Sequence, residues 1–228
     1  LAETVSLGFA AGIMVAASVW SLIMPAQAMS EAQGGTPWLT SAAGVAAGAL
    51  FLKLLDTALP HLHPGAARPE GPKTSMHRAM LLFIAITLHN IPEGGSMGLV
   101  AGSAALSGEP AALSSALALA LGLGIQNIPE GAAVSLPLAG QGLSRRRAFL
   151  FGAVSGIVEP VFGLLIVLVL QSVMPAMPFM LTFAAGAMLY VVVEELIPAA
   201  HLSKHSDAGT LAVIAGFILM MTLDTALG

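Results

Sequence analysis

The chain has 228 residues, of which 57% are hydrophobic and only 9% are charged, and its formal net charge is −4. A soluble globular domain carries about 25% charged residues, so this composition excludes one and indicates an integral membrane protein. Cysteine is absent, which excludes disulfides, thiolate metal sites and c-type haem attachment.

Seven apolar runs follow one another along the chain, each long enough to cross a membrane as a helix. A helix needs about 20 residues to cross a hydrocarbon core of about 30 Å, roughly twice the length of a barrel strand. We therefore predict an all-α integral membrane protein, a polytopic helix bundle formed by one transmembrane domain over residues 1–228, with no cleaved leader. The predicted spans are residues 5–26, 39–59, 79–105, 111–138, 148–173, 178–200 and 209–227.

The eight Lys and Arg residues occupy alternate loops. Four flank or lie in the loop 60–77, three lie in the loop 141–147, and one lies in the loop 201–208. Lys and Arg are retained on the cytoplasmic side of a membrane. These three loops and the N-terminus are therefore expected inside the cell and the C-terminus outside, with the chain in the inner (plasma) membrane.

One motif occurs twice within the apolar runs. HNIPEG at residues 89–94 returns 37 positions later as QNIPEG at residues 126–131. An ionisable group at bilayer depth costs at least ~2.5 to 3.5 kcal/mol, so it normally faces a cavity, a partner or an ion pathway. Proline cannot donate to the carbonyl four residues back, and each motif is therefore expected to break or kink its helix and free acceptor oxygens.

Each motif places its polar side chains in two directions. His89 and Glu93 are spaced i, i+4 and share one helical face, and Gln126 and Glu130 repeat this spacing. The Asn of each motif lies one position on from the His or Gln, about 100° round the helix. This geometry suits two adjacent ions better than one.

A third acidic residue, Glu159, precedes Pro160 in the fifth run. Three carboxylates without Lys or Arg at that depth must either be protonated or hold cations. Imidazole, carboxylate and amide ligands suit zinc, iron(II), manganese or cadmium more than calcium or magnesium. The candidate ligands are His89, Asn90, Glu93, Gln126, Asn127, Glu130 and Glu159. Taken alone, Met14 is core filler, as Met on an apolar helix usually is.

Other polar residues gather near the ends of the runs. Towards the inner ends, a solvated face and a cytoplasmic exit path both fit Asp56, His61, His63, Glu194, Glu195 and His201. Towards the outer end, Asp224 fits either a helix cap or an entrance carboxylate. Ser21 fits the same entrance, or a hydroxyl that bonds to its own helix.

These residues resemble the ZIP (Zrt/Irt-like) family of divalent-metal transporters, and within it the bacterial GufA-like branch. The resemblance rests on HNIPEG, QNIPEG, the Glu159-Pro160 pair and the run GFAAGIMVAASVWSLIMP at residues 8–25. It implies a binuclear metal centre between the two motif helices. One ion would bind His89, Glu93, Gln126 and Glu130 with Met14 nearby, and the other would bind Asn90, Asn127 and Glu159, with Glu93 and Glu130 bridging.

The same resemblance implies a cytoplasmic exit route through Asp56 and Glu195, with His61 and His63 in a metal-binding inner loop at 60–77. The family has eight spans, so the first family span is expected to be absent from this chain. A homodimer is a candidate assembly.

The expected function is transport of divalent transition-metal ions towards the cytoplasm by alternating access. Zinc is the first expectation, and Fe²⁺, Mn²⁺ and Cd²⁺ follow; each is a transported substrate and not a prosthetic group. We expect no enzyme activity. The expected partners are the metal ions and the lipid bilayer, with no nucleic acid. The alternative, an intramembrane zinc metalloenzyme, needs a site such as His-Glu-x-x-His, which the sequence lacks.

Overall fold

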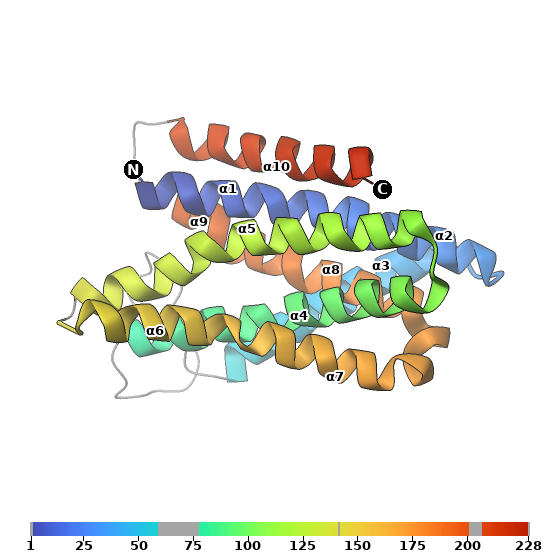
Figure 1. Cartoon of the computed structure of the whole chain (residues 1–228), viewed down its shortest axis with the longest axis horizontal. Coiled ribbons are helices and arrows are strands. Elements are labelled where there is room, and N and C mark those ends of the chain that lie inside the picture. The colour runs from blue at the N-terminus through green and yellow to red at the C-terminus, as the bar shows by residue number, and fades with distance from the viewer. Residues whose placement is uncertain (1, 59–77, 141, 201–206, 228) are drawn as a thin grey trace.

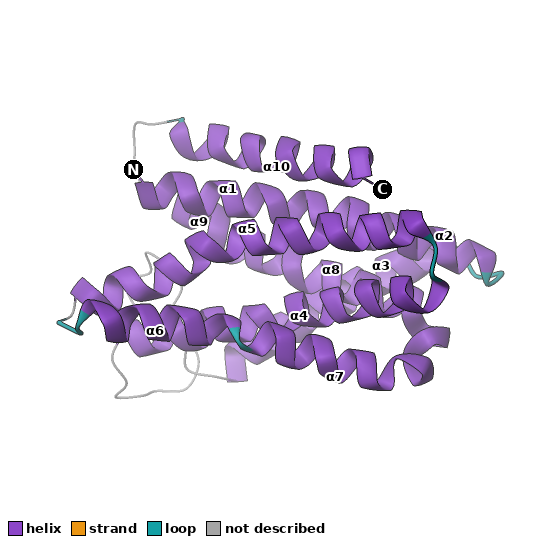
Figure 2. Ribbon diagram, in the orientation of Figure 1, coloured by secondary structure: helices purple, strands orange, loops and turns teal. Residues whose placement is uncertain are grey.

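A computed structural model describes residues 2–58, 78–140, 142–200 and 207–227. All regular secondary structure in these ranges is helical, which confirms the all-α fold (Figure 2). The whole loop 60–77, with His61 and His63, lies outside the described residues, as does His201.

The helices begin and end close to the limits of the apolar runs. A continuous helical stretch opens the chain and includes one π-helical segment, and a second π-helical segment lies near the C-terminus. The elements are α1 (Ala2–Ala17), η1 (Ser18–Ile23), α2 (Met24–Ala32), α3 (Pro37–Ala58), α4 (Arg78–Ser107), α5 (Pro110–Gly140), α6 (Arg145–Gly156), α7 (Val158–Val173), η2 (Met174–Ala176), α8 (Met177–Val191), η3 (Val192–Leu196), α9 (Ile197–Ala200) and α10 (Ala208–Leu227).

Five stretches of the described residues are long and apolar enough to cross a membrane. They are Thr4–Ala32, Pro37–Ala58, Pro110–Gly140, Arg145–Leu196 and Ala208–Ala226. The fourth has 52 residues and contains α6, α7 and α8, with the chain reversing direction at η2 (Figure 1). The chain is therefore a helical membrane protein, whereas the count of seven spans stays a prediction.

The helices pack as close pairs. Helix α1 lies against α10, α3 against α8, α4 against α7 and α5 against α6 (Figure 1). Glycine permits this approach: a Cβ atom on Gly12 would overlap the backbone of α10, and one on Gly48 would overlap the backbone of α8. Lipid supplies no hydrophobic drive between membrane helices, so close backbone contact is a main source of their attraction.

The two motif-bearing helices are joined by a very short turn. Helix α4 ends at Ser107, Gly108 takes a positive φ of 66°, and α5 begins at Pro110. Glycine adopts this left-handed conformation without the steric cost that a Cβ would bring. As a result α4 and α5 are in contact, and residues well before the turn face residues well after it.

Neither motif breaks its helix, whereas a kink at each proline stays a prediction. Helix α4 continues through Pro92, and α5 continues through Pro129. A proline removes one hydrogen bond, and membrane helices tolerate that loss when neighbours satisfy the freed groups. The interruption lies instead at Ile157, between α6 and α7, three residues before Pro160.

Candidate metal centre

Two amide–carboxylate pairs connect the helices at the level of the motifs. Gln126 Nε2 on α5 donates to Glu93 Oε2 on α4 over 2.8 Å. The next residue, Asn127, donates from Nδ2 to Glu159 Oε2 on α7 over 2.7 Å. Glu93 and Gln126 are buried completely or nearly so. The paired motifs and the third acid are therefore brought together, as the sequence predicted for these four residues.

Asn90 makes a similar link to the interrupted helix. Its Nδ2 donates to the main-chain carbonyl of Ser155 over 2.9 Å. Ser155 is the next-to-last residue of α6, directly before the interruption at Ile157. Ser155 was not among the residues predicted from the sequence, because a main-chain acceptor leaves no signal in the residue type.

All three amide groups therefore use their nitrogen as a donor and leave their oxygen unpaired. Within the described residues, five buried oxygens of this region have no hydrogen-bond partner. We call them the acceptor cluster: Asn90 Oδ1, Glu93 Oε1, Gln126 Oε1, Asn127 Oδ1 and Glu159 Oε1. A buried acceptor without a partner costs about 1 to 3 kcal/mol, so five of them together require a common explanation. A bound cation would be such an explanation, because it would be the shared partner of these five oxygens.

Carboxylates alone do not form the site. No group of three or more His, Asp or Glu side chains that could hold a metal ion occurs in the described part of the chain. Glu130 is buried as well. The amide oxygens and the imidazole of His89 therefore stay part of the predicted ligand set. His89 lies on α4, but its side chain is outside the described part of the structure.

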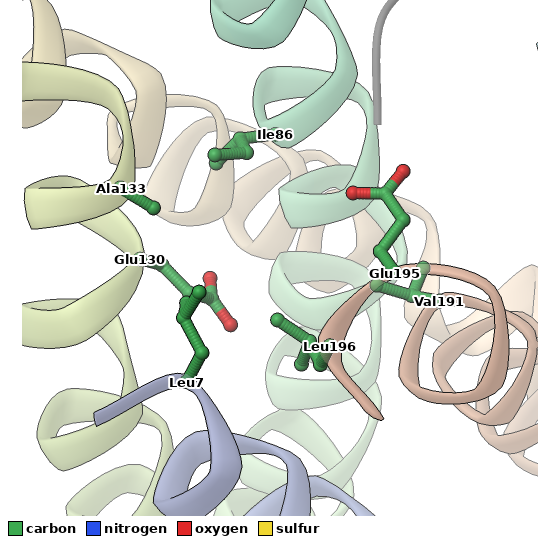
Figure 3. A pocket seen from close by; sticks show the side chains of 7 residues that line it. All are labelled: Leu7, Ile86, Glu130, Ala133, Val191, Glu195 and Leu196. Carbon is green, nitrogen blue, oxygen red and sulfur yellow. The ribbon is translucent and has the colours of Figure 1, made fainter. Parts of the chain in front are cut away.

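Glu130, the acid of the second motif, lines a small cavity (Figure 3). The cavity has a volume of about 20 Å³, enough for about one water-sized group. Glu195 lines it too, and Figure 3 shows Glu130 and Glu195 on opposite sides of the view with Leu196 below them. The remaining lining residues are Leu7, Ile86, Ala133 and Val191.

The adjacent acids Glu194 and Glu195 have different surroundings. Glu195 is 3% exposed, whereas Glu194 lies on the exposed side of the same helix. Both belong to the π-helical segment η3, and π-helical turns occur often at functional sites. Asp56, on α3, is buried as well.

The candidate entrance residues contact each other. Ser21 Oγ donates to Asp224 Oδ1 over 2.7 Å, which joins η1 to α10. The Ser21 hydroxyl therefore does not bond to its own helix in this structure. Met14 is fully buried on α1, and its carbonyl accepts the hydroxyl of Ser18.

Two grooves reach the acceptor cluster from the outside of the bundle. One, of about 510 Å³, lies between α4, α5 and α7 and is lined by Asn127 and Glu159. The other, of about 370 Å³, lies between α5 and α6 and is also lined by Asn127. Asn127 therefore lies where both grooves approach the cluster.

Comparison with known sequences identifies the family. A family model described as ZIP zinc transporter matches residues 67–224, which is most of the chain and includes both motifs. The chain belongs to the ZIP family. This confirms the resemblance drawn from HNIPEG and QNIPEG.

Several ZIP family relatives match over nearly the whole chain. It is 36% identical to the human zinc transporter ZIP11, over 98% of this chain and 88% of that protein. Identity to the zinc transporter ZIPB of Bordetella bronchiseptica is 39%, over 97% of this chain and 71% of the relative. The chain is 36% identical to the zinc transporter GufA of Myxococcus xanthus, over 92% of this chain and 81% of that protein. All three relatives are named as transporters, which points to transport and away from enzyme activity.

Proposed function

We propose that this chain carries divalent transition-metal ions, zinc first among them, across the membrane towards the cytoplasm. The ions would bind between α4, α5 and α7 in a two-ion site and would be released by alternating access. Fe²⁺, Mn²⁺ and Cd²⁺ are the other substrates that this ligand set suits. The names of the ZIP relatives support zinc as the substrate.

The acceptor cluster is the observation that carries this proposal. Three amides donate to a neighbouring oxygen and leave their own oxygens unpaired, beside two carboxylates that each leave one oxygen unpaired. A site for an anion or a hydrogen-bond acceptor would need free donors instead. The proposed ligands are these five residues with His89, Glu130 and Met14, in the two sets that the family resemblance implies.

The route through the protein follows from the neighbouring polar residues. Ser21 and Asp224 would attract ions at the outer side, and Glu195 would receive them from Glu130 through the small cavity. Asp56 and the histidines of the loop 60–77 would complete the exit.

The orientation rests on the alternation of Lys and Arg between loops. It places the loops 60–77, 141–147 and 201–208 in the cytoplasm and the protein in the inner membrane. Seven spans fit this orientation, because the N-terminal end of α1 and the C-terminal end of α10 lie towards opposite ends of the bundle (Figure 1). A homodimer is compatible with it.

Uptake of zinc into proteoliposomes tests the proposal. The full chain is reconstituted with and without a pH gradient, and Cd²⁺, Mn²⁺ and Fe²⁺ are added as competitors. We expect Glu93→Ala and Glu130→Ala to abolish uptake while the protein still inserts. Glu109→Ala is the matched control, because Glu109 is an exposed acid in the turn between the same two helices. Normal zinc accumulation in both motif variants would contradict the proposed site.

A further inference from the structure

The last residue of the first motif, Gly94, lies against the backbone of α7. A Cβ atom at this position would overlap the main chain of Glu159. One turn further along α4, a Cβ atom at Gly98 would overlap the main chain of Gly163 in the same way. The backbones of α4 and α7 therefore touch at the residue that carries the third carboxylate.

Gly95 and the corresponding glycine of the second motif, Gly131, lack this close contact. The next residue, Gly95, has no atom within 4 Å of the place where its Cβ would lie. In the second motif, a Cβ at Gly131 would meet the carbonyl oxygen of Gly152 at 3.5 Å, which is ordinary van der Waals contact. The two motifs share the same final glycine, but only in the first does the structure leave no room for a side chain.

The position of Glu159 depends on such contacts because α7 is not a simple continuation of α6. Glu159 lies in the first turn of α7, two residues after the interruption at Ile157. On one side of the interruption Asn90 binds the carbonyl of Ser155, and on the other Asn127 binds the Glu159 carboxylate. Gly94 provides the third contact, which fixes how closely the Glu159 main chain approaches α4.

We infer that Gly94 is a positioning residue for Glu159. By lacking a side chain, it lets α7 approach until the Glu159 carboxylate reaches Asn127 and joins the acceptor cluster. A methyl group at this position would push the start of α7 outward and withdraw one carboxylate from the cluster, leaving Glu93 and Gln126 in place. The consequence for ion binding rests on the proposed function, whereas the displacement of α7 does not.

Cross-linking tests the displacement without any metal ion. The chain contains no cysteine, so Asn127→Cys with Glu159→Cys introduces the only two thiols. The rate of bridging by a short bifunctional thiol reagent, dibromobimane, reports how close these two side chains lie. We expect the rate to fall about tenfold when Gly94→Ala is added, because displacements near 1 Å change such rates strongly. Gly95→Ala is the matched control and should leave the rate unchanged, since it adds the same methyl group in open space on the same helix.

Ion binding tests the consequence. Calorimetric titration of the purified chain with Cd²⁺ should give two bound ions for the unaltered protein and for Gly95→Ala. Gly94→Ala should weaken the affinity for one of the two ions by about 10- to 100-fold and leave the affinity for the other unchanged. Losses of this size are typical when a group that orients a metal ligand is altered. Adding Glu159→Gln to Gly94→Ala should cause no further loss, because both changes would act on the same carboxylate.

The outcomes separate the two proposals. Equal cross-linking rates in Gly94→Ala and Gly95→Ala would overturn the positioning role, and so would additive losses in the double variant. Absence of ion binding by the unaltered protein, with slowed cross-linking in Gly94→Ala, would count against the proposed function alone. If Gly94→Ala does not fold, Gly163→Ala replaces it, because its Cβ would lie 3.1 Å from the Gly94 carbonyl oxygen and press on the same contact more gently.

Discussion

The side-chain amide of Gln126 donates to a carboxylate oxygen of Glu93 over 2.8 Å, and this bond joins the two copies of the repeated motif. The second copy differs from the first at this position, where Gln replaces His. The Gln126 amide supplies an N–H donor, whereas the Glu93 carboxylate has only acceptor oxygens. Gln126, which takes the place of the first motif's His, therefore links the two motif helices and keeps its own side-chain oxygen unpaired.

Removing this amide should destabilise the protein in the absence of metal. Gln126→Leu leaves Glu93 buried without its donor, and we expect a loss of about 1 to 3 kcal/mol in the free energy of unfolding. Thermal unfolding in a chelating buffer measures this loss. Gln171→Leu, on the exposed side of α7, serves as the control. An unchanged Tm for Gln126→Leu would show that the bond to Glu93 contributes nothing to the fold.

Zinc should stabilise the folded protein through the acceptor cluster. A ligand at 100 times its Kd adds about 2.7 kcal/mol to the free energy of unfolding. We expect zinc to raise the Tm of the unaltered chain and of Glu109→Gln. It should not do so in Glu93→Gln, which keeps the shape of the side chain and removes its charge. A full zinc-dependent rise in Glu93→Gln would place the bound ion elsewhere.

Asp224 should affect ion capture more than turnover. Asp224→Asn keeps an acceptor for the Ser21 hydroxyl but removes the negative charge, so the contact between η1 and α10 is retained. We expect KM for zinc uptake to rise about tenfold at low salt with kcat nearly unchanged, because a charge at an entrance raises the local ion concentration. The difference should shrink as ionic strength increases. A fall in kcat at constant KM would assign Asp224 to a later step.

Glu195 should be needed for release, and its neighbour should not. Glu195→Gln removes the charge of a buried acid that lines the same small cavity as Glu130, whereas Glu194→Gln changes an exposed residue of the same turn. We expect Glu195→Gln to lower kcat of uptake about tenfold and Glu194→Gln to leave it close to that of the unaltered chain. Initial rates in proteoliposomes with zinc-sensitive dye inside measure both. Equal rates in the two variants would remove Glu195 from the route.

The sequence predicted the helices well because apolar runs of membrane length leave few alternatives. The predicted run 79–105 became α4 (Arg78–Ser107), and the run 209–227 became α10 (Ala208–Leu227). The repeat also pointed to the acids and amides that lie together, since Glu93, Gln126, Asn127 and Glu159 are joined by hydrogen bonds in the pairs described.

Other features depended on contacts between distant residues and could not be predicted in this way. Proline predicted a break or a kink at Pro92 and Pro129, but α4 and α5 continue through these residues, and the interruption occurs at Ile157. The π-helical turns that carry Ser21 and Glu195 have no residue pattern of their own. The need for Gly94, and not Gly95, to lack a side chain follows only from the position of α7.

The three amides also determine how much charge the protein must carry when it is empty. Asn90, Gln126 and Asn127 offer oxygens to an ion without adding any formal charge of their own. If these positions were carboxylates, the unloaded centre would hold about twice the negative charge, and each additional buried ion costs several kcal/mol in the low-dielectric interior. The carrier proposed above would have to reset without cargo after every delivery. Neutral amide ligands would lower the electrostatic barrier to that return step, so they would serve the empty half of the proposed transport cycle as well as the loaded half.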